Sequence, residues 1–131
     1  MRLISTSMIA VVVLVAGCGD QQAAAPPESG IAGSVHLGPQ CPVETVNNPC
    51  KDKPAANVTV TISQQLPGEA YAAGPTVAQT TTDGAGAFRV IVPPGEYVVT
   101  AQAGMSCELM DARVSASAYV EVDVPCDTGI R

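Results

Sequence analysis

Hydrophobic and polar residues alternate in several short stretches of the chain after residue 30. The pattern is clearest in 57–63 and 119–124, where Val or Ile residues at every second position are separated by Asn, Thr, Ser or acidic residues. A period of two predicts strands with one buried and one exposed face, and β-branched residues favour such strands. The expected strands are 31–37, 57–63, 77–82, 87–92, 96–101, 112–114 and 119–124. No segment has a convincing helical period, so we expect an all-β fold, a seven-stranded antiparallel β-sandwich.

Turn residues separate the expected strands. Asp83 is followed by Gly84 and Gly86, which predicts a turn capped by the Asp83 side chain, with both glycines at positive φ. Pro93-Pro94-Gly95 predicts a second reversal. Phe88, the only Phe in the chain, is expected to anchor a core that otherwise consists of aliphatic residues.

The first 17 residues read as an export signal rather than as part of the fold. Arg2 is followed by an apolar run, 3–16, which is shorter than the roughly 20 residues that a membrane-spanning helix needs. The run ends in Val15-Ala16-Gly17-Cys18, which resembles the bacterial lipobox. We therefore expect 1–17 to be a lipoprotein signal peptide, cleaved before a lipid-modified Cys18, which would place the domain outside the cytoplasm on a bacterial membrane. An ordinary signal peptide with a chance Cys is the alternative. Residues 18–29 are expected to form a flexible tether, and 30–131 the single folded domain.

The cysteine count agrees with this interpretation. Five Cys is an odd number for an exported protein, and lipid modification of Cys18 leaves four that can pair in an oxidising compartment. If the last two strands turn around Ala116-Ser117, opposed residues have numbers that sum to about 233, which places Cys107 opposite Cys126. Cys41 then pairs with Cys50. A metal site is the weaker alternative, because the chain has a single His and no CxxC pair.

Charge narrows the range of partners. The formal net charge is −6, and removal of Arg2 with the signal peptide leaves five Lys and Arg against twelve Asp and Glu, a net charge of −7. An acidic domain repels phosphate backbones and anionic headgroups, so nucleic acid is not expected as a partner. Attachment to the membrane is expected to depend on the lipid of Cys18 alone.

Four sequence segments together resemble the bacterial carboxypeptidase-regulatory-like domains. They are GIAGSVHLGPQCPV (30–43), PCKDKP (49–54), TTDGAGAFRVIVPPGEYVV (81–99) and the final DTGIR (127–131). The resemblance implies a Greek-key sandwich of the transthyretin (prealbumin) type. It also implies a non-catalytic module that serves as a spacer, a display unit, or a binder of carbohydrate or protein. In this setting we expect Asp127 and Arg131 to pair with Lys51, Lys53 or Asp52 and close one end of the sandwich.

The loops 38–56 and 104–111 are the expected contact surface, because β-sandwiches carry variable function on their end loops. The candidate contact residues are Val43, Glu44, Asn47, Asn48, Met105, Glu108 and Met110. Met105 and Met110, which flank Cys107, are expected either to form an apolar contact patch or to tuck onto the end of the core.

Catalytic and metal-binding alternatives have little support in the sequence. His36 is expected on an exposed face with no nucleophile and no orienting carboxylate, so it reads as a surface His. Glu121 and Asp123 share one face and could resemble a glycosidase pair, but charges that protect an exposed sheet explain them more simply. Glu108, Asp111 and Asp123 form the candidate calcium set, without the spacing of a calcium loop. We therefore expect no cofactor and no metal.

These observations favour a monomeric, non-enzymatic lipoprotein of the cell envelope that binds a protein or glycan partner or acts as a structural or display unit. The alternative is a small-molecule or transport accessory lipoprotein, which would need a ligand-sized apolar pocket.

Overall fold

The structure is a computed structural model that describes residues 28–43, 45–47, 49–68 and 72–131. The described residues form nine strands and no helix. The strands are β1 (Gly30–Gly38), β2 (Lys53–Pro54), β3 (Thr59–Gln65), β4 (Ala73–Thr81), β5 (Ala87–Ile91), β6 (Gly95–Ala101), β7 (Ser106–Cys107), β8 (Met110–Val114) and β9 (Tyr119–Asp127). Within these ranges, no helix is long and apolar enough to cross a membrane. The proposed signal peptide, Cys18 and most of the proposed tether lie outside the described residues.

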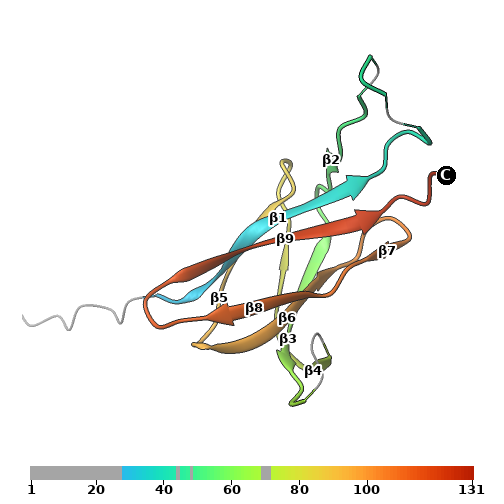
Figure 1. The fold of residues 1–131 in the computed structure, drawn as a ribbon. Coiled ribbons are helices and arrows are strands. Elements are labelled where there is room, and N and C mark those ends of the chain that lie inside the picture. The colour runs from blue at the N-terminus through green and yellow to red at the C-terminus, as the bar shows by residue number, and fades with distance from the viewer. Residues whose placement is uncertain (1–27, 44, 48, 69–71) are drawn as a thin grey trace, which may run out of the picture.

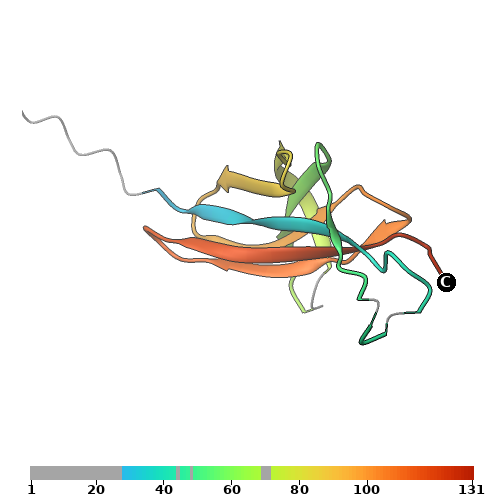
Figure 2. The same ribbon diagram turned by 90° about the horizontal axis from the view of Figure 1, so that it is seen from above.

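The strands form two sheets that pack together around one core (Figures 1 and 2). The first sheet has the order β2-β1-β9-β7, and β5 pairs with the same edge of β1 as β2 does. The second sheet has the order β4-β3-β6-β8. The all-β prediction is therefore confirmed. The expected count of seven strands differs from the nine observed because two-residue strands, β2 and β7, form in segments that carry no alternation.

One strand pair contradicts the expectation of purely antiparallel pairing. β1 and β9 run parallel over their full lengths, from Gly30 opposite Tyr119 to Gly38 opposite Asp127. The register places Val35 beside Val124, and both side chains are fully buried. Parallel strands need a long connection, and here nearly the whole domain separates the two. Alternation alone assigns the buried face of each strand but not the direction of its neighbour.

The core contains the residues that the alternation places on the buried faces. Buried aliphatic side chains from both sheets form one cluster that also contains Phe88, which is 5% exposed. The largest fully buried members of this cluster are Ile31, Ile62, Val35, Val60, Val99 and Val124. Val98 is the exception to the pattern, because it lies on the outer face of β6 and is still buried, outside the core cluster.

The segment 106–114 switches from one sheet to the other. β7 pairs with the end of β9, and the Glu108 amide continues this pairing with a 3.0 Å hydrogen bond to the carbonyl of Pro125. From Met110 the chain pairs with β6 instead. The expected hairpin around Ala116-Ser117 is therefore only partly present: the turn exists, but β8 and β9 belong to different sheets.

The parallel arrangement gives the domain two distinct ends. The entry end contains the first described residues, Glu28 and Ser29, and the loops 92–95 and 115–118. Hydrogen bonds join these parts, from the Val92 amide to the Ser29 carbonyl (3.1 Å) and from the Gly30 amide to the Ala118 carbonyl (3.1 Å). The far end contains the described segments 39–43, 45–47, 49–52, 102–105 and 128–131, into which β1, β6 and β9 lead. Figures 1 and 2 show the C-terminus at the far end and the entering chain at the opposite end.

Candidate functional site

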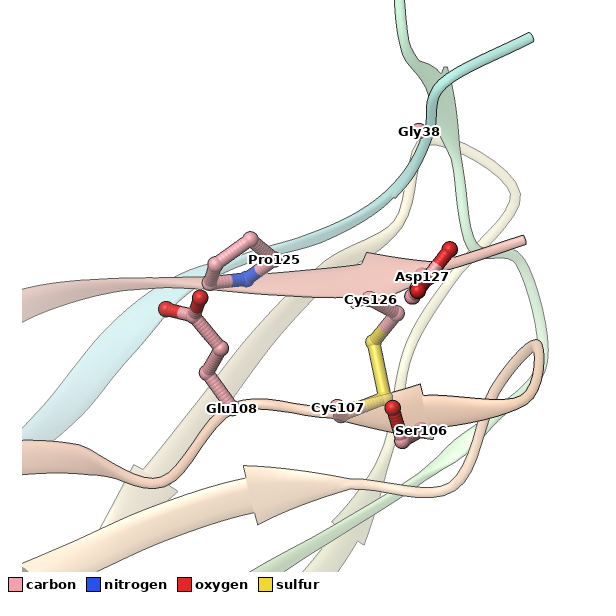
Figure 3. A pocket seen from close by; sticks show the side chains of 7 residues that line it. All are labelled: Gly38, Ser106, Cys107, Glu108, Pro125, Cys126 and Asp127. Carbon is pink, nitrogen blue, oxygen red and sulfur yellow. A yellow bond between two sulfur atoms is a disulfide. The ribbon is translucent and has the colours of Figure 1, made fainter. Parts of the chain in front are cut away.

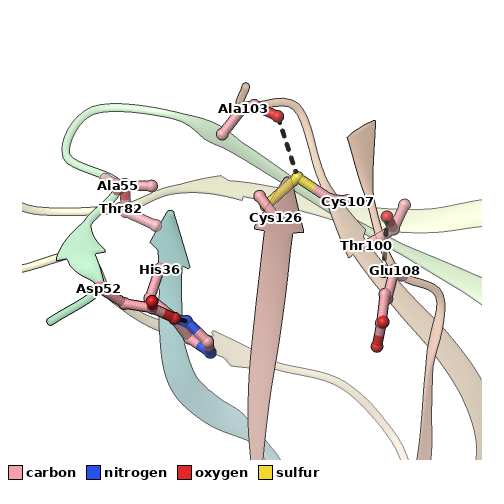
Figure 4. Close-up of a disulfide and its surroundings, with 9 residues drawn as sticks. All are labelled: His36, Asp52, Ala55, Thr82, Thr100, Ala103, Cys107, Glu108 and Cys126. Carbon is pink, nitrogen blue, oxygen red and sulfur yellow. Dashed lines mark hydrogen bonds and ion pairs between the residues drawn. A yellow bond between two sulfur atoms is a disulfide. The ribbon is translucent and has the colours of Figure 1, made fainter. Parts of the chain in front are cut away.

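Both disulfides lie at the far end. Cys41 and Cys50 are paired with a Cα–Cα distance of 5.9 Å and close the loop that follows β1. Cys107 and Cys126 are directly opposed in the β7–β9 ladder, with a Cα–Cα distance of 4.0 Å (Figure 4). These are the two pairs that the sequence predicts. The first disulfide closes the loop between β1 and β2 on itself, and the second joins β7 to β9.

Two open depressions flank β7. The first, of about 300 Å³, is lined by Gly38, Ser106, Cys107, Glu108, Pro125, Cys126 and Asp127 (Figure 3). The second, of about 520 Å³, is lined by residues 101–106. Figure 3 shows the Glu108 and Asp127 carboxylates on either side of the disulfide, so the first depression has an acidic rim. Its walls offer oxygen acceptors to a ligand with hydroxyl or amide donors.

The C-terminal segment closes the far end by hydrogen bonds to the chain that leaves β1. The Thr128 amide donates to the carbonyl of Gly38 (3.1 Å), and the Thr128 hydroxyl donates to the carbonyl of Pro39 (2.5 Å). Arg131 pairs with Asp127, with 3.1 Å between Nη2 and Oδ2. The hydrogen bond from Arg131 and a second from the Gly129 amide lower the pKa of Asp127.

The expected ion pairs with Lys51, Lys53 or Asp52 do not form. Asp127 and Arg131 pair with each other because they are four residues apart on a segment that turns back at Gly129, which has a φ of 83°. The Gly129 amide donates to Oδ1 of Asp127 (2.8 Å), which holds the turn. The C-terminal segment thus closes this end of the sandwich, but through the hydrogen bonds of Thr128 and not through the expected ion pairs.

His36 has an orienting carboxylate, contrary to the expectation from the sequence. Its Nδ1 lies 2.7 Å from Oδ2 of Asp52 (Figure 4). The two residues are sixteen positions apart, and the loop closed by Cys41 and Cys50 brings them together. The contact therefore joins the returning end of this loop to β1. Sequence reasoning missed it because Asp52 lies in an irregular segment whose path depends on the disulfide.

The candidate contact residues are only partly brought together. Val43 and Met105 are 71% and 75% exposed at the far end, and Asn47 and Glu108 are also exposed. Met110 lies within β8 and packs against the core, so the two methionines do not form one surface patch. Glu44 and Asn48 lie outside the described residues.

Val46, which is 98% exposed, is an apolar far-end residue that the sequence analysis did not select. The sequence does contain a signal for its exposure: Val46 lies in a Pro- and Asn-rich segment without alternation, so no strand was expected to bury its side chain.

The remaining acidic candidates stay on the surface. Glu121 and Asp123 are exposed on the outer face of β9, and Asp123 accepts a 2.9 Å hydrogen bond from the Ser34 hydroxyl. Among the described residues, no group of three or more His, Cys, Asp or Glu could hold a metal ion, so Glu108, Asp111 and Asp123 do not form the suggested calcium set.

Comparisons of the chain with protein-family models, with curated proteins and with solved structures found no match. The resemblance to carboxypeptidase-regulatory-like domains therefore rests on the four sequence segments alone.

Proposed function

We propose that this protein is an exported lipoprotein whose β-sandwich is a non-catalytic module that presents its far end to a protein or glycan partner outside the cytoplasm. The observation that carries the proposal is the position of both disulfides at the far end, opposite the end where the chain enters. Disulfides form in oxidising compartments, which agrees with export. The fifth cysteine, Cys18, is then explained by lipid modification.

The orientation of β1 supports a display role. β1 has nine residues and leads from the entry end to the far end, and a strand of this length spans about 30 Å. A lipid on Cys18 would hold the entry end toward the membrane. The loops of the far end would then point away from it.

The exposed side chains of the far end favour a protein partner over a purely structural role. Val43, Val46 and Met105 are mostly exposed there, and apolar side chains in loops that two disulfides hold in place suit a contact surface. The alternative, a small-molecule accessory lipoprotein, would need a ligand-sized apolar pocket. The depression of about 520 Å³ is open and lined in part by Gln102 and Ser106, so it suits that alternative less well.

The finer fold assignment belongs to the same proposal. Seven of the nine strands have five residues or more, and they are packed as two sheets. Together with the four sequence segments, this supports a Greek-key sandwich of the prealbumin type, expected to be monomeric. Residues 1–17 are proposed as the signal peptide and 18–29 as the lipidated tether.

Site-specific photo-crosslinking in cells that produce the full chain tests the proposal. A photo-reactive amino acid at Val46 reports on the far end, and one at Ala116, which is also exposed, is the matched control at the entry end. We expect a discrete envelope adduct from position 46, none of the same mass from position 116, and loss of the adduct in a Cys18→Ser chain. A Cys18 without lipid in the mature protein, or the same adducts from both positions, would overturn the proposal.

A further inference from the structure

Two segments without charge, 92–95 and 115–118, lie at the entry end beside Glu28 and Ser29. Residues 92–95 are Val-Pro-Pro-Gly and 115–118 are Ser-Ala-Ser-Ala. Beside them, Ile91 is 63% exposed on the outer face of β5, and Pro93, Pro94, Ala116 and Ala118 are exposed as well. The two segments nearest the proposed anchor are therefore small, uncharged and partly apolar.

The charged residues nearest this end largely balance one another. Arg113 binds Glu96, with 2.6 Å between Nη2 and Oε1, directly behind the 92–95 loop. Arg89 lies 3.6 Å from the centre of the Tyr119 ring. The Tyr119 hydroxyl in turn hydrogen-bonds the Glu28 carboxylate (3.0 Å). Glu121 on β9 lies opposite Ala32, at the same level as Arg89 on β5. Three glutamates and two arginines thus leave the entry end with a formal charge of −1, whereas the chain without its first 17 residues carries −7.

This distribution changes the expectation drawn from the whole-chain charge. An acidic domain as a whole is repelled by anionic headgroups, but repulsion between exposed charges is screened beyond a Debye length of about 8 Å at physiological salt. β1 carries the chain about 30 Å from the entry end to the far end. A nearly neutral end of the domain can therefore touch a bilayer while the more acidic part stays in water.

The chain is fixed to this end close to the proposed anchor. The Ser29 side chain is buried and its hydroxyl donates to the Val92 carbonyl (2.7 Å), so Ser29 is held at the entry end. Ten peptide units separate Cys18 from Glu28. In any conformation they span at most about 35 Å. A lipid on Cys18 thus keeps the entry end within this distance of the bilayer.

We propose that the entry end is a membrane-contact surface, formed by Ile91 and the loops 92–95 and 115–118, which rests on the phospholipid bilayer that holds the lipid of Cys18. This inference rests on the lipid anchor of the proposed function. This contact would orient the domain so that the far end points away from the bilayer. It would also restrict the orientations in which the far end can bind a partner.

Single-tryptophan variants test the contact directly, because the chain has no Trp. Ile91→Trp and Ala116→Trp place the probe at the entry end, and Val46→Trp is the matched control at the far end. All three positions are exposed, so the substitutions fill no packed space. The lipidated full chain is reconstituted in phosphatidylcholine vesicles whose acyl chains carry bromine, which quenches tryptophan fluorescence at short range.

We expect a blue-shifted emission and several-fold stronger quenching at positions 91 and 116 than at position 46. Adding Ala118→Glu to the Ala116→Trp chain is expected to reduce this quenching, since a carboxylate resists desolvation at the headgroup layer. Flotation of the same vesicles shows whether the chain is bound to the membrane at all, so it separates failure of the lipid anchor from failure of the entry-end contact. Chains that float with equal quenching at all three positions would overturn the membrane contact alone. Chains that do not float would overturn the lipid anchor and the contact with it.

Discussion

A single carboxylate, that of Asp83, holds the turn between β4 and β5. The Asp83 carboxylate accepts hydrogen bonds from the amides of Ala85 (2.8 Å) and Ala87 (3.0 Å), which is the cap that the sequence predicts. Gly86 has the expected positive φ, at 74°, whereas Gly84 is not in a positive-φ conformation. An Asp-Gly-x-Gly sequence shows that a turn forms, but not which of its glycines takes the left-handed conformation.

The two glycines give a matched pair of substitutions. In Gly86→Ala, the new Cβ would lie 2.6 Å from the Val35 carbonyl oxygen, in addition to adopting a left-handed backbone. We expect a loss of about 1–3 kcal/mol in the free energy of unfolding. A Cβ at Gly84 meets nothing within 4 Å, so we expect Gly84→Ala to change the stability by less than about 1 kcal/mol. Chemical denaturation with intact disulfides measures both, and equal losses would show that Gly86 has no special constraint.

Asp127 makes the stability of the folded domain depend on pH under acidic conditions. Because Arg131 and the Gly129 amide bind the carboxylate, the pKa of Asp127 is lowered from its ordinary value of 3.8. A carboxyl with a lower pKa in the folded state stabilises the fold above its ordinary pKa, and this contribution is lost as the pH falls through the lowered pKa.

We therefore expect the melting temperature of the native protein to fall more steeply than that of Asp127→Asn as the pH drops below 3.8. Thermal melts over this range provide the measurement. Parallel curves for the two proteins would show that the Asp127–Arg131 contact does not form in solution.

Among the secondary-structure elements, β7 and β8 show what the sequence could and could not determine. The register with a sum of 233 is correct for Cys107 opposite Cys126 and for Ser106 opposite Asp127. It fails from Met110 onward, because β8 pairs with β6. The alternation of Ala112 and Val114 is satisfied in either sheet, since both sheets face the same core. Such a pattern identifies the buried residues and leaves the choice of sheet open. The parallel pairing of β1 with β9 was missed for the same reason.

Removing each disulfide separately tests the roles of the two loops. In the chain-entropy model, each closed loop contributes about 3 kcal/mol, so replacing either cysteine pair by alanine is expected to destabilise the domain by roughly that amount. The Cys107→Ala/Cys126→Ala variant is expected to lose more, because Cys126 is 4% exposed within the core, whereas Cys41 and Cys50 are only partly buried. Denaturation of both double variants gives the comparison, and a larger loss for the Cys41–Cys50 pair would contradict it.

Hydrogen exchange shows which segments each disulfide stabilises. We expect faster exchange in β7 and at Glu108 when Cys107 and Cys126 are replaced, since the short β7 is held to β9 by a two-residue ladder and the adjoining Glu108 hydrogen bond. The 39–52 segment is expected to keep its exchange rates in that variant. The opposite pattern is expected when Cys41 and Cys50 are replaced.

For the whole molecule, composition and alternation were enough to predict an all-β domain with a single core around Phe88. They were not enough to predict its two ends. The separation of a nearly neutral entry end from a disulfide-linked far end depends on β1 and β9 running parallel. It also depends on contacts between residues far apart in sequence, such as Thr128 with Gly38. These contacts follow from the order and direction of the strands in the sheets, which the alternation of hydrophobic and polar residues does not determine.

A single core shared by the two sheets predicts that the domain unfolds as one unit. Ile31 in β1 and Ile62 in β3 are both fully buried, one in each sheet. Each Ile→Val substitution is expected to lower the free energy of unfolding by about 0.5–1.5 kcal/mol. Because both side chains belong to one cluster, either substitution should reduce the protection of the slowest-exchanging amides in both sheets by the same amount. Native-state hydrogen exchange measures this for each strand. If Ile31→Val weakened only the strands paired with β1, the sheets would be separate cooperative units, and the far end would keep its shape only as long as the first sheet did.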